Sequence, residues 1–201
     1  MSSQPVNQRM RIRLLQTGGL LLVASLLFAH PALTGDGHEM IELVGLGLVS
    51  ACVAGRMWSI LYIGSRKNQE LVTNGPYSIS RNPLYFFSVL GAAGVGLFVG
   101  SVTLTLMLGL ATWLVLAATA RKEAAHLETL FGSRYATYAS RTPLFWPNPT
   151  HYREAGDVTF SPAALKRTFL DGLLFFAAFP AIELVEHLQD GGYLPILFRL
   201  P

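Results

Sequence analysis

Charged side chains are scarce in this chain. Only 13% of its 201 residues are charged and 51% are hydrophobic, whereas a soluble domain usually carries about 25% charged residues. This shortage excludes an ordinary soluble domain and indicates a single compact integral membrane domain. The net charge of +3 does not indicate nucleic-acid binding, because the basic residues flank the hydrophobic runs, where we expect the surface of a membrane.

Cysteine is almost absent as well, and the histidines are dispersed. The single cysteine, Cys52, lies in an apolar segment and excludes an intrachain disulfide, so we interpret it as a packed apolar residue. The five histidines are at positions 30, 38, 126, 151 and 187. They show no two-ligand spacing on one helix face, and one cysteine cannot build a thiolate site. The sequence therefore predicts no metal site.

Four long hydrophobic runs predict the membrane spans. Leu14–Gly35 contains 22 residues without a permanent charge, and a span needs about 20. This run follows three arginines, as a signal peptide would, but its length and the poor cleavage site at Ala29–Pro31 favour a retained span. The run from Glu39 to Ile63 is the second candidate span.

The longest uncharged run predicts a helical hairpin. Asn82–Ala120 has 39 residues without charge, which is roughly 58 Å if helical and about twice the thickness of a bilayer core. We expect two helices that reverse at Gly100-Ser101, and the glycines at 91, 94 and 96 favour close helix packing, with the approach of a cofactor as the alternative. Phe169–Leu188 is interrupted by acidic residues, and we favour a fifth span over an interfacial helix. The expected fold is an all-α polytopic transmembrane bundle with four or five spans.

The basic residues predict the orientation of these spans. If Arg9, Arg11 and Arg13 are cytoplasmic, only Arg199 of the fifteen basic residues falls on the opposite side, as the positive-inside rule requires. We therefore expect the N-terminus and the loops that follow the second and fourth spans to face the cytoplasm.

A turn-rich polar stretch, residues 71–85, leads directly into the hairpin. Asn82 is a favoured N-cap and Pro83 a favoured first helical residue, so we expect a helix to start there. Such a helix end attracts an anionic group, although ordinary capping explains the same two residues. Asn74-Gly75-Pro76 predicts a turn. Irregular backbone near a bilayer is tolerated only where protein or a water-filled cavity surrounds it, so this stretch is a candidate ligand site.

Two kinds of side chain accompany this turn. Tyr77 and Tyr85 flank it, and aromatic faces attract cations, including onium groups; tyrosines at the membrane interface are the alternative. Glu123 and His126 are three residues apart at the end of the fourth span, so they share one helix face, with a solvated helix end as the alternative. An anion-attracting helix start, an aromatic face and a carboxylate together suit a zwitterionic amino acid that carries an onium centre.

In this order, the residues resemble the isoprenylcysteine carboxyl methyltransferase and phospholipid methyltransferase family of integral membrane enzymes. The resemblance covers about residues 56 to 148 and rests on Leu71-Val72-x-x-Gly75-Pro76-Tyr77-x-x-x-Arg81-Asn82-Pro83-x-Tyr85, then Glu123, Phe131-Gly132, Tyr135, Tyr138 and Pro143. It implies an S-adenosylmethionine-dependent methyltransferase with a cytoplasmic cofactor pocket and a lipophilic or lipid acceptor that enters from the membrane. The cofactor-binding positions it implies are Gln69, Glu70, Leu71, Val72, Tyr77, Asn82, Pro83, Leu84, Tyr85 and Glu123.

The chain departs from the family pattern at three positions. Asn82 stands where the family has a histidine, and asparagine does not titrate near neutral pH. The usual paired glutamates are reduced to Glu123 with Ala124, and an arginine that would orient an acceptor carboxylate is Thr119. The last difference weakens the case for a prenylcysteine acceptor. A phospholipid amine, a thiol, a carboxylate and a small hydrophobic metabolite all stay open as acceptors.

We expect direct transfer of a sulfonium methyl group, catalysed mainly by holding the two reactants in the right geometry. Arg121 and His126 are hypotheses for orienting the acceptor or handling a proton. In the single domain, residues 1–66 would be N-terminal spans, 67–150 the methyltransferase core and 151–201 a C-terminal helical extension. A membrane sterol-type reductase that uses NADPH and a non-enzymatic membrane scaffold are the alternatives. The oligomeric state is not predicted.

Overall fold

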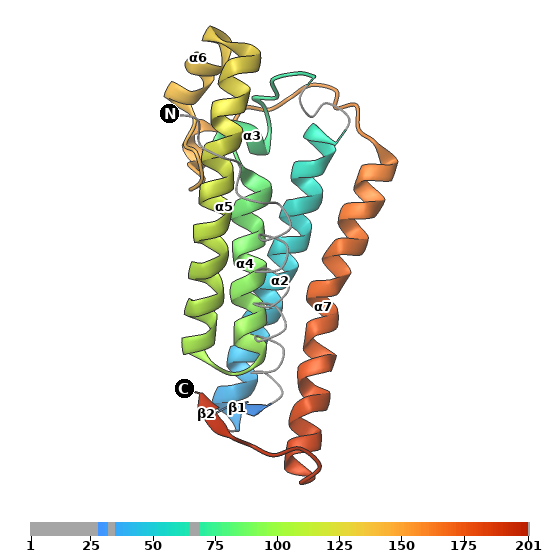
Figure 1. Cartoon of the computed structure of the whole chain (residues 1–201). Helices are drawn as coiled ribbons and strands as arrows, with labels where there is room; N and C mark the ends of the chain where they lie inside the picture. Colours follow the sequence, from blue (N-terminus) through green and yellow to red (C-terminus); the bar gives the residue numbers. More distant parts are fainter. Residues whose placement is uncertain (1–27, 32–34, 65–68, 201) are drawn as a thin grey trace, which may run out of the picture.

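The computed structural model describes residues 28–31, 35–64 and 69–200. Four long helices run side by side as an elongated bundle (Figure 1): α2 (Asp36–Ile63), α4 (Pro83–Phe98), α5 (Val102–Phe131) and α7 (Pro162–Asp190). The short elements are α3 (Pro76–Ile79), α6 (Ser133–Arg141), the single turn η1 (Pro149–His151) and the strands β1 (Ala29–Pro31) and β2 (Phe198–Leu200). Helix α4 packs against both α2 and α5, and α7 packs mainly on α2.

The lengths and compositions of these helices confirm an all-α membrane bundle. Gly37–Ile63, Val102–Phe131 and Pro162–Asp190 are each long and apolar enough to cross a membrane, and α4 is a shorter apolar helix. Lipid offers no hydrogen bonds to the backbone, so apolar segments of this length satisfy their N–H and C=O groups within a helix. The predicted fifth span, Phe169–Leu188, lies within α7, which runs along α2 as a member of the bundle (Figure 1).

The first predicted span, Leu14–Gly35, lies largely outside the described residues. Its last part differs from the prediction, because Ala29–Pro31 is a strand, β1, that pairs in parallel with β2. Proline explains the difference: Pro31 has no N–H to donate within a helix, and it biases His30 before it toward extended backbone. The two strands therefore join a segment near the start of the described chain to its end.

The predicted hairpin is confirmed, including its reversal. Helix α4 ends at Phe98 and α5 begins at Val102, with Gly100 at a φ of 62° in the turn between them. The Ser101 side chain accepts a hydrogen bond from the Leu104 N–H at 3.1 Å and so caps α5. Glycine adopts a positive φ more readily than other residues, which explains why the run reverses here.

Glycines set the close spacing between α4 and its neighbours. A Cβ atom at Gly94 would lie 2.8 Å from the carbonyl oxygen of Gly45 on α2, and one at Gly96 would lie 2.5 Å from the Thr105 backbone on α5. These glycines therefore allow close helix packing, and the space beside them is filled by backbone rather than left for a cofactor. Cys52 is fully buried, as expected of a packed residue.

The two ends of the bundle differ in structure. One end, which we call the loop end, carries residues 69–82, helix α6 and residues 142–161 (Figure 1). The opposite end, which we call the strand end, carries β1, β2, the start of α2 and the end of α7. The two loops that the charge pattern assigns to one side of the membrane thus lie together at the loop end. That this end faces the cytoplasm stays a prediction.

Candidate functional site

A sharp turn at the loop end positions the polar stretch that precedes α4. Gly75 has a φ of 58°, a value that favours glycine. A Cβ atom at Gly75 would also lie 2.3 Å from the ring of Tyr62 on α2. The turn leads directly into α3, where the Ser78 hydroxyl donates to the Gly75 carbonyl at 2.7 Å. The turn predicted from Asn74-Gly75-Pro76 is therefore held by its own hydrogen bonds and by packing against α2.

Residues 142–153, which we call the strap, cross this turn and pair with its polar groups. The Arg81 N–H donates to the Pro143 carbonyl at 2.8 Å, and the Asn82 side-chain amide donates to the Leu144 carbonyl at 2.9 Å. Asn82 stands at the predicted N-cap position of α4, but its side chain makes no capping hydrogen bond. The capping bond is replaced by a tertiary contact, because the strap carbonyl lies within reach of the same amide.

A cavity of about 270 Å³, which we call the helix-mouth cavity, opens beside the turn. Its apolar wall comes from the ends of α2 and α5 and the start of α4, and its polar wall comes from residues 70–85 and from α5. The cavity thus brings together the two polar segments that the hairpin separates in sequence. Tyr77 and Glu123, on which the sequence-based proposal depends, both line it.

Tyrosines and one glutamate form the polar centre of this cavity. The Tyr85 hydroxyl is within hydrogen-bonding reach of the Glu123 carboxylate. Tyr77 is only 5% exposed, and its backbone carbonyl accepts a hydrogen bond from the Tyr138 hydroxyl at 2.7 Å. Burial raises the pKa of the Tyr77 hydroxyl well above its ordinary value, and the nearby Tyr138 and Glu123 add to the rise. Tyr77 is therefore a neutral hydroxyl that can donate a hydrogen bond.

Most of the predicted site residues share this cavity. Nine of the twelve line it: Glu70, Leu71, Val72, Tyr77, Asn82, Leu84, Tyr85, Glu123 and His126. The other three do not, because Gln69 is exposed in the loop, Pro83 is fully buried at the start of α4, and Arg121 is exposed on α5. Residues two positions apart do not share a helix face, so Arg121 points away from the side of α5 that carries Glu123.

Six further residues of the cavity wall are not among the predicted ones: Ile60, Ile63, Gly64, Arg81, Leu127 and Tyr138. The first three come from the end of α2, and no local pattern places that end beside the turn. Leu127 lies four positions after Glu123, so helical spacing alone would have found it. The Arg81 side chain donates to the Tyr135 hydroxyl at 3.1 Å, while its Nε is buried without a hydrogen-bond partner among the described residues.

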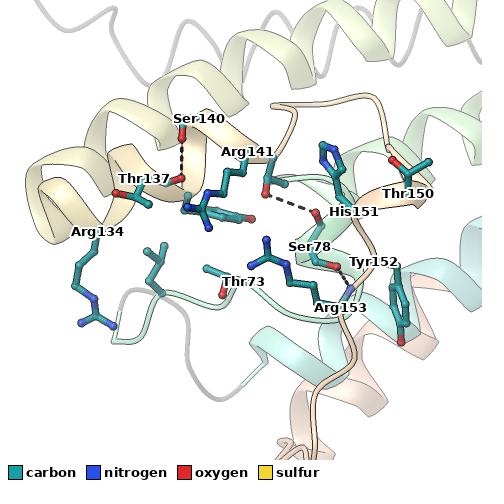
Figure 2. Close-up of a pocket in the computed structure, with 13 residues that line it drawn as sticks. Thr73, Ser78, Arg134, Thr137, Ser140, Arg141, Thr150, His151, Tyr152 and Arg153 are labelled. Carbon is teal, nitrogen blue, oxygen red and sulfur yellow. Dashed lines mark hydrogen bonds between the residues drawn. The ribbon is translucent and has the colours of Figure 1, made fainter.

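A larger cavity of about 820 Å³, which we call the basic cavity, adjoins the first one. Leu71 and Tyr138 line both cavities. Figure 2 shows the side chains of Arg141, from the end of α6, and Arg153, from the strap, reaching into this space. The Arg153 N–H also donates to the Ser78 hydroxyl at 2.9 Å, which holds the strap against α3. The basic side chains give this cavity a positive potential that attracts anionic groups.

A separate cluster of ionisable side chains lies at the strand end. His38 Nε2 is 3.1 Å from Glu42 Oε1 on the same helix and 3.5 Å from Glu186 Oε2 on α7. One ligand atom of each residue lies within 4.8 Å of the other two, a grouping that can hold a metal ion. Histidine spacing alone does not reveal this cluster. His38 and Glu42 form an i,i+4 pair of different residue types, and Glu186 joins them only because α7 packs on α2.

Comparison with known proteins identifies methyltransferase relatives for the central part of the chain. Residues 42–134 match the family model for phospholipid methyltransferases. The chain is also 30% identical over 92 residues to a protein-S-isoprenylcysteine O-methyltransferase of Schizosaccharomyces pombe, a match that covers 45% of this chain and 39% of that protein. The segment 42–134 includes the turn before α4, the whole hairpin and Glu123.

Two bacterial relatives align over most of the chain. The cobalt-zinc-cadmium resistance protein CzcN of Cupriavidus metallidurans is 36% identical over 180 residues, which cover 89% of this chain and 83% of that protein. The nickel-cobalt-cadmium resistance protein NccN of Alcaligenes xylosoxydans xylosoxydans is 35% identical over 158 residues, which cover 79% of this chain and 74% of that protein. No solved structure matches the chain.

Proposed function

We propose that this chain transfers a methyl group from S-adenosylmethionine to a lipophilic acceptor in the membrane. Its similarity to the phospholipid methyltransferase family model over residues 42–134 and to an isoprenylcysteine O-methyltransferase supports this proposal. These similarities and the helix composition support a membrane methyltransferase; the methyl donor and the class of acceptor are the further parts of the proposal. One observation carries it: Tyr77, Tyr85 and Glu123 meet in one cavity beside the start of α4.

The groups around the helix-mouth cavity complement the charges of S-adenosylmethionine, which carries a carboxylate, an ammonium and a sulfonium. Glu123, next to the Tyr85 hydroxyl, offers a charged hydrogen-bond acceptor for the ammonium. The Tyr77 ring offers an aromatic face for the sulfonium. Arg81 has a buried Nε without a hydrogen-bond partner among the described residues, and its guanidinium offers a partner for the carboxylate, as the N-terminal end of α4 does.

The two adjoining cavities provide enough room for such a cofactor. Ligand pockets usually measure about 300–1,000 Å³, so the helix-mouth cavity of about 270 Å³ is small by itself. The basic cavity adds about 820 Å³ beyond Leu71 and Tyr138. We therefore place the reactive part of the cofactor in the helix-mouth cavity and let the remainder extend into the basic cavity.

The acceptor would approach along the apolar wall of the helix-mouth cavity. Ile60 and Ile63 belong to α2 and Leu127 to α5, and both helices have the length and composition of membrane spans. A lipophilic molecule can therefore reach the polar centre without leaving apolar surroundings. When bound, S-adenosylmethionine would supply an electrophilic methyl group. The chain would contribute position and orientation, and His126, on the cavity wall, would be the residue that takes a proton from the acceptor.

The position of Arg121 argues against its predicted part in the reaction. Its side chain is exposed and lies outside the helix-mouth cavity, so the structure supports only His126 of the two hypotheses. The phospholipid methyltransferase family model and the isoprenylcysteine O-methyltransferase relative favour methyl transfer over the reductase and scaffold alternatives.

A ligand screen on the detergent-purified protein tests the proposal. We expect S-adenosylhomocysteine to raise the unfolding temperature, because a ligand that binds only the folded state stabilises it, and NADPH to have no effect. Stabilisation by NADPH alone would favour the reductase, and stabilisation by neither compound would favour the scaffold. Incubation of methyl-labelled S-adenosylmethionine with membrane lipids and hydrophobic metabolites, followed by mass spectrometry, would then identify the acceptor.

A second function is favoured by the relatives that align over most of the chain. Both are named for resistance to transition metals, and we propose that this chain contributes to resistance of its cell against divalent metal cations. In a strain that lacks its own copy, we expect the native chain to restore growth on cobalt or zinc salts and Glu123→Ala to fail. Equal growth with both would show that resistance does not require methyl transfer.

A further inference from the structure

We propose that His38, Glu42 and Glu186 form a binding site for one divalent transition-metal cation at the strand end. The ligands come from the first turns of α2 and the last turns of α7. Figure 1 shows that these turns lie at the opposite end of the bundle from α3 and α6, which border the helix-mouth cavity. The metal site is therefore separate from the cofactor site proposed above, and it does not depend on that proposal.

The distances between the donor atoms fit one shared cation. Zn²⁺ binds imidazole nitrogen and carboxylate oxygen at about 2.0–2.2 Å, so two ligand atoms on a tetrahedral ion lie roughly 3.4 Å apart. His38 Nε2 is 3.1 Å from Glu42 Oε1 and 3.5 Å from Glu186 Oε2. The ligand atoms of Glu42 and Glu186 also lie within 4.8 Å of each other, so a cation between them would draw these two oxygens together.

The charges in the cluster are unbalanced without a cation. Two carboxylates approach the same imidazole nitrogen, and one proton on Nε2 can make a short, straight hydrogen bond with only one of them. Glu183 lies within hydrogen-bonding reach of Glu42 and adds a third carboxylate. The side chains of His38, Glu42 and Glu186 are only 15%, 13% and 16% exposed, so water screens their repulsion weakly. A divalent cation would balance two of these negative charges.

Part of the donor set is not used by the protein itself. Glu186 Oε1 is buried and has no hydrogen-bond partner among the described residues, and the same is true of His38 Nδ1. Buried polar atoms without partners are uncommon because their desolvation is costly. A cation bound by Glu186 would compensate the buried carboxylate. With the ring proton of His38 on Nδ1, Nε2 keeps a lone pair that faces both carboxylates.

The donor set indicates the class of metal. One imidazole with two carboxylates suits Zn²⁺, Co²⁺ or Ni²⁺, whereas Ca²⁺ and Mg²⁺ prefer oxygen ligands alone. Three protein ligands leave at least one coordination position open. A second imidazole–carboxylate pair, His30 Nε2 and Asp190 Oδ1 at 3.3 Å, lies at the same end, and His30 is close enough to influence Glu186 electrostatically.

The alternative is that a protonated His38 pairs with Glu42 and Glu186 and only holds α2 against α7. Measurement of Zn²⁺ binding to the full-length protein distinguishes a metal site from such an ion pair. The protein would carry a purification tag without histidines, be stripped of metal by a chelator, and then be titrated with Zn²⁺ in competition with a chromophoric chelator. We expect one tightly bound Zn²⁺ per chain.

Variants with matched controls locate this zinc. Glu186→Gln preserves the size of the side chain and removes its charge, and we expect it to weaken Zn²⁺ binding by more than about tenfold; His38→Ala should do the same. The controls are Glu39→Gln and His187→Ala, because both residues are exposed and lie on the same turns of α2 and α7. Both controls should bind Zn²⁺ as tightly as the native chain.

Two results would overturn the proposal. One is a native protein that binds no Zn²⁺, and the other is an unchanged affinity in both Glu186→Gln and His38→Ala; either would leave the cluster as an ion pair only. Binding of S-adenosylhomocysteine, measured on the same samples, should be unchanged in Glu186→Gln. That readout shows that the variant is folded, and it keeps a failure of the metal site distinguishable from a failure of the proposed methyl-transfer function.

Discussion

The loop end and the strand end of the bundle assemble polar groups in different ways. At the loop end, a turn, a helix start and a pair of residues on one helix face supply most of the helix-mouth cavity, so its parts are visible as short sequence patterns. At the strand end, His38 and Glu42 meet Glu186 across 144 positions of sequence, and no single segment contains the set. The polar site at the loop end is built mainly from local motifs, whereas the cluster at the strand end forms only because α7 packs on α2.

The largest expected effect tests whether the two ends are independent. Glu123→Ala removes the carboxylate that faces Tyr85 and that would pair with the ammonium group of the bound ligand. Loss of one partner from a buried, hydrogen-bonded charge pair costs about 2–5 kcal/mol of binding free energy. We expect the calorimetric Kd for S-adenosylhomocysteine to rise at least about 30-fold, while Zn²⁺ binding is unchanged. Glu128→Ala, on an exposed position of the same helix, is the control. An unchanged Kd in Glu123→Ala would remove this residue from the cofactor site.

The next largest effect tests whether the stability of the fold depends on the turn at Gly75. Gly75→Ala would place a side chain at a positive φ and against the Tyr62 ring, and we expect a loss of about 1–3 kcal/mol in the free energy of unfolding. Gly47→Ala on α2 is the control, because nothing lies within 4 Å of a Cβ there. Thermal unfolding in detergent measures both. Equal unfolding temperatures for the two variants would contradict this account of the turn.

A smaller effect concerns the hydrogen bond between α6 and α3. Tyr138→Phe loses the hydrogen bond to the Tyr77 carbonyl, and we expect the free energy of unfolding to fall by about 0.5–1.5 kcal/mol. Burial raises the pKa of the Tyr138 hydroxyl above its ordinary value of 10.0. The folded state therefore holds this proton more tightly than the unfolded chain does, so the contribution to stability is complete below about pH 10 and is lost as the pH rises further.

The unfolding temperature as a function of pH measures this contribution. Above about pH 10, Tyr138→Phe should lose less stability per pH unit than the native chain. Part of the alkaline loss should persist in the variant, because the pKa of Tyr77 is raised as well. Parallel curves for the variant and the native chain would show that Tyr138 does not contribute to the alkaline transition.

The smallest expected effect separates the two residues that the sequence proposes for acceptor chemistry. Arg121→Ala should leave kcat and KM nearly unchanged, because exposed substitutions away from a site usually change free energies by about 0.5 kcal/mol or less. His126→Ala should lower kcat, since His126 lines the helix-mouth cavity and Arg121 does not. Methyl-transfer kinetics with the identified acceptor measure both variants. A large loss in Arg121→Ala would mean that the side chain reaches the substrate after all.

Most of the candidate cofactor site could be predicted from short-range patterns. Asn74-Gly75-Pro76 predicts the turn that forms, and the spacing of Glu123 and His126 predicts the shared face that both present to the cavity. Three of the predicted residues lie outside the helix-mouth cavity, each for a local reason. Pro83 is fully buried in the first turn of α4, and Gln69 and Arg121 are exposed outside the cavity. The expectation that the Asn82 side chain caps α4 was wrong, because its amide donates a hydrogen bond to the Leu144 carbonyl of the strap instead.

By itself, the sequence determined the membrane bundle, the hairpin and its reversal, because hydrophobic length and glycine or proline at a turn act over a few neighbouring residues. Only the tertiary structure decided that the end of α2 closes the helix-mouth cavity, that the strap supplies hydrogen bonds to the turn, and that Glu186 meets His38. These contacts depend on how whole helices pack, and packing is set by the combined shapes of side chains that lie far apart in the chain.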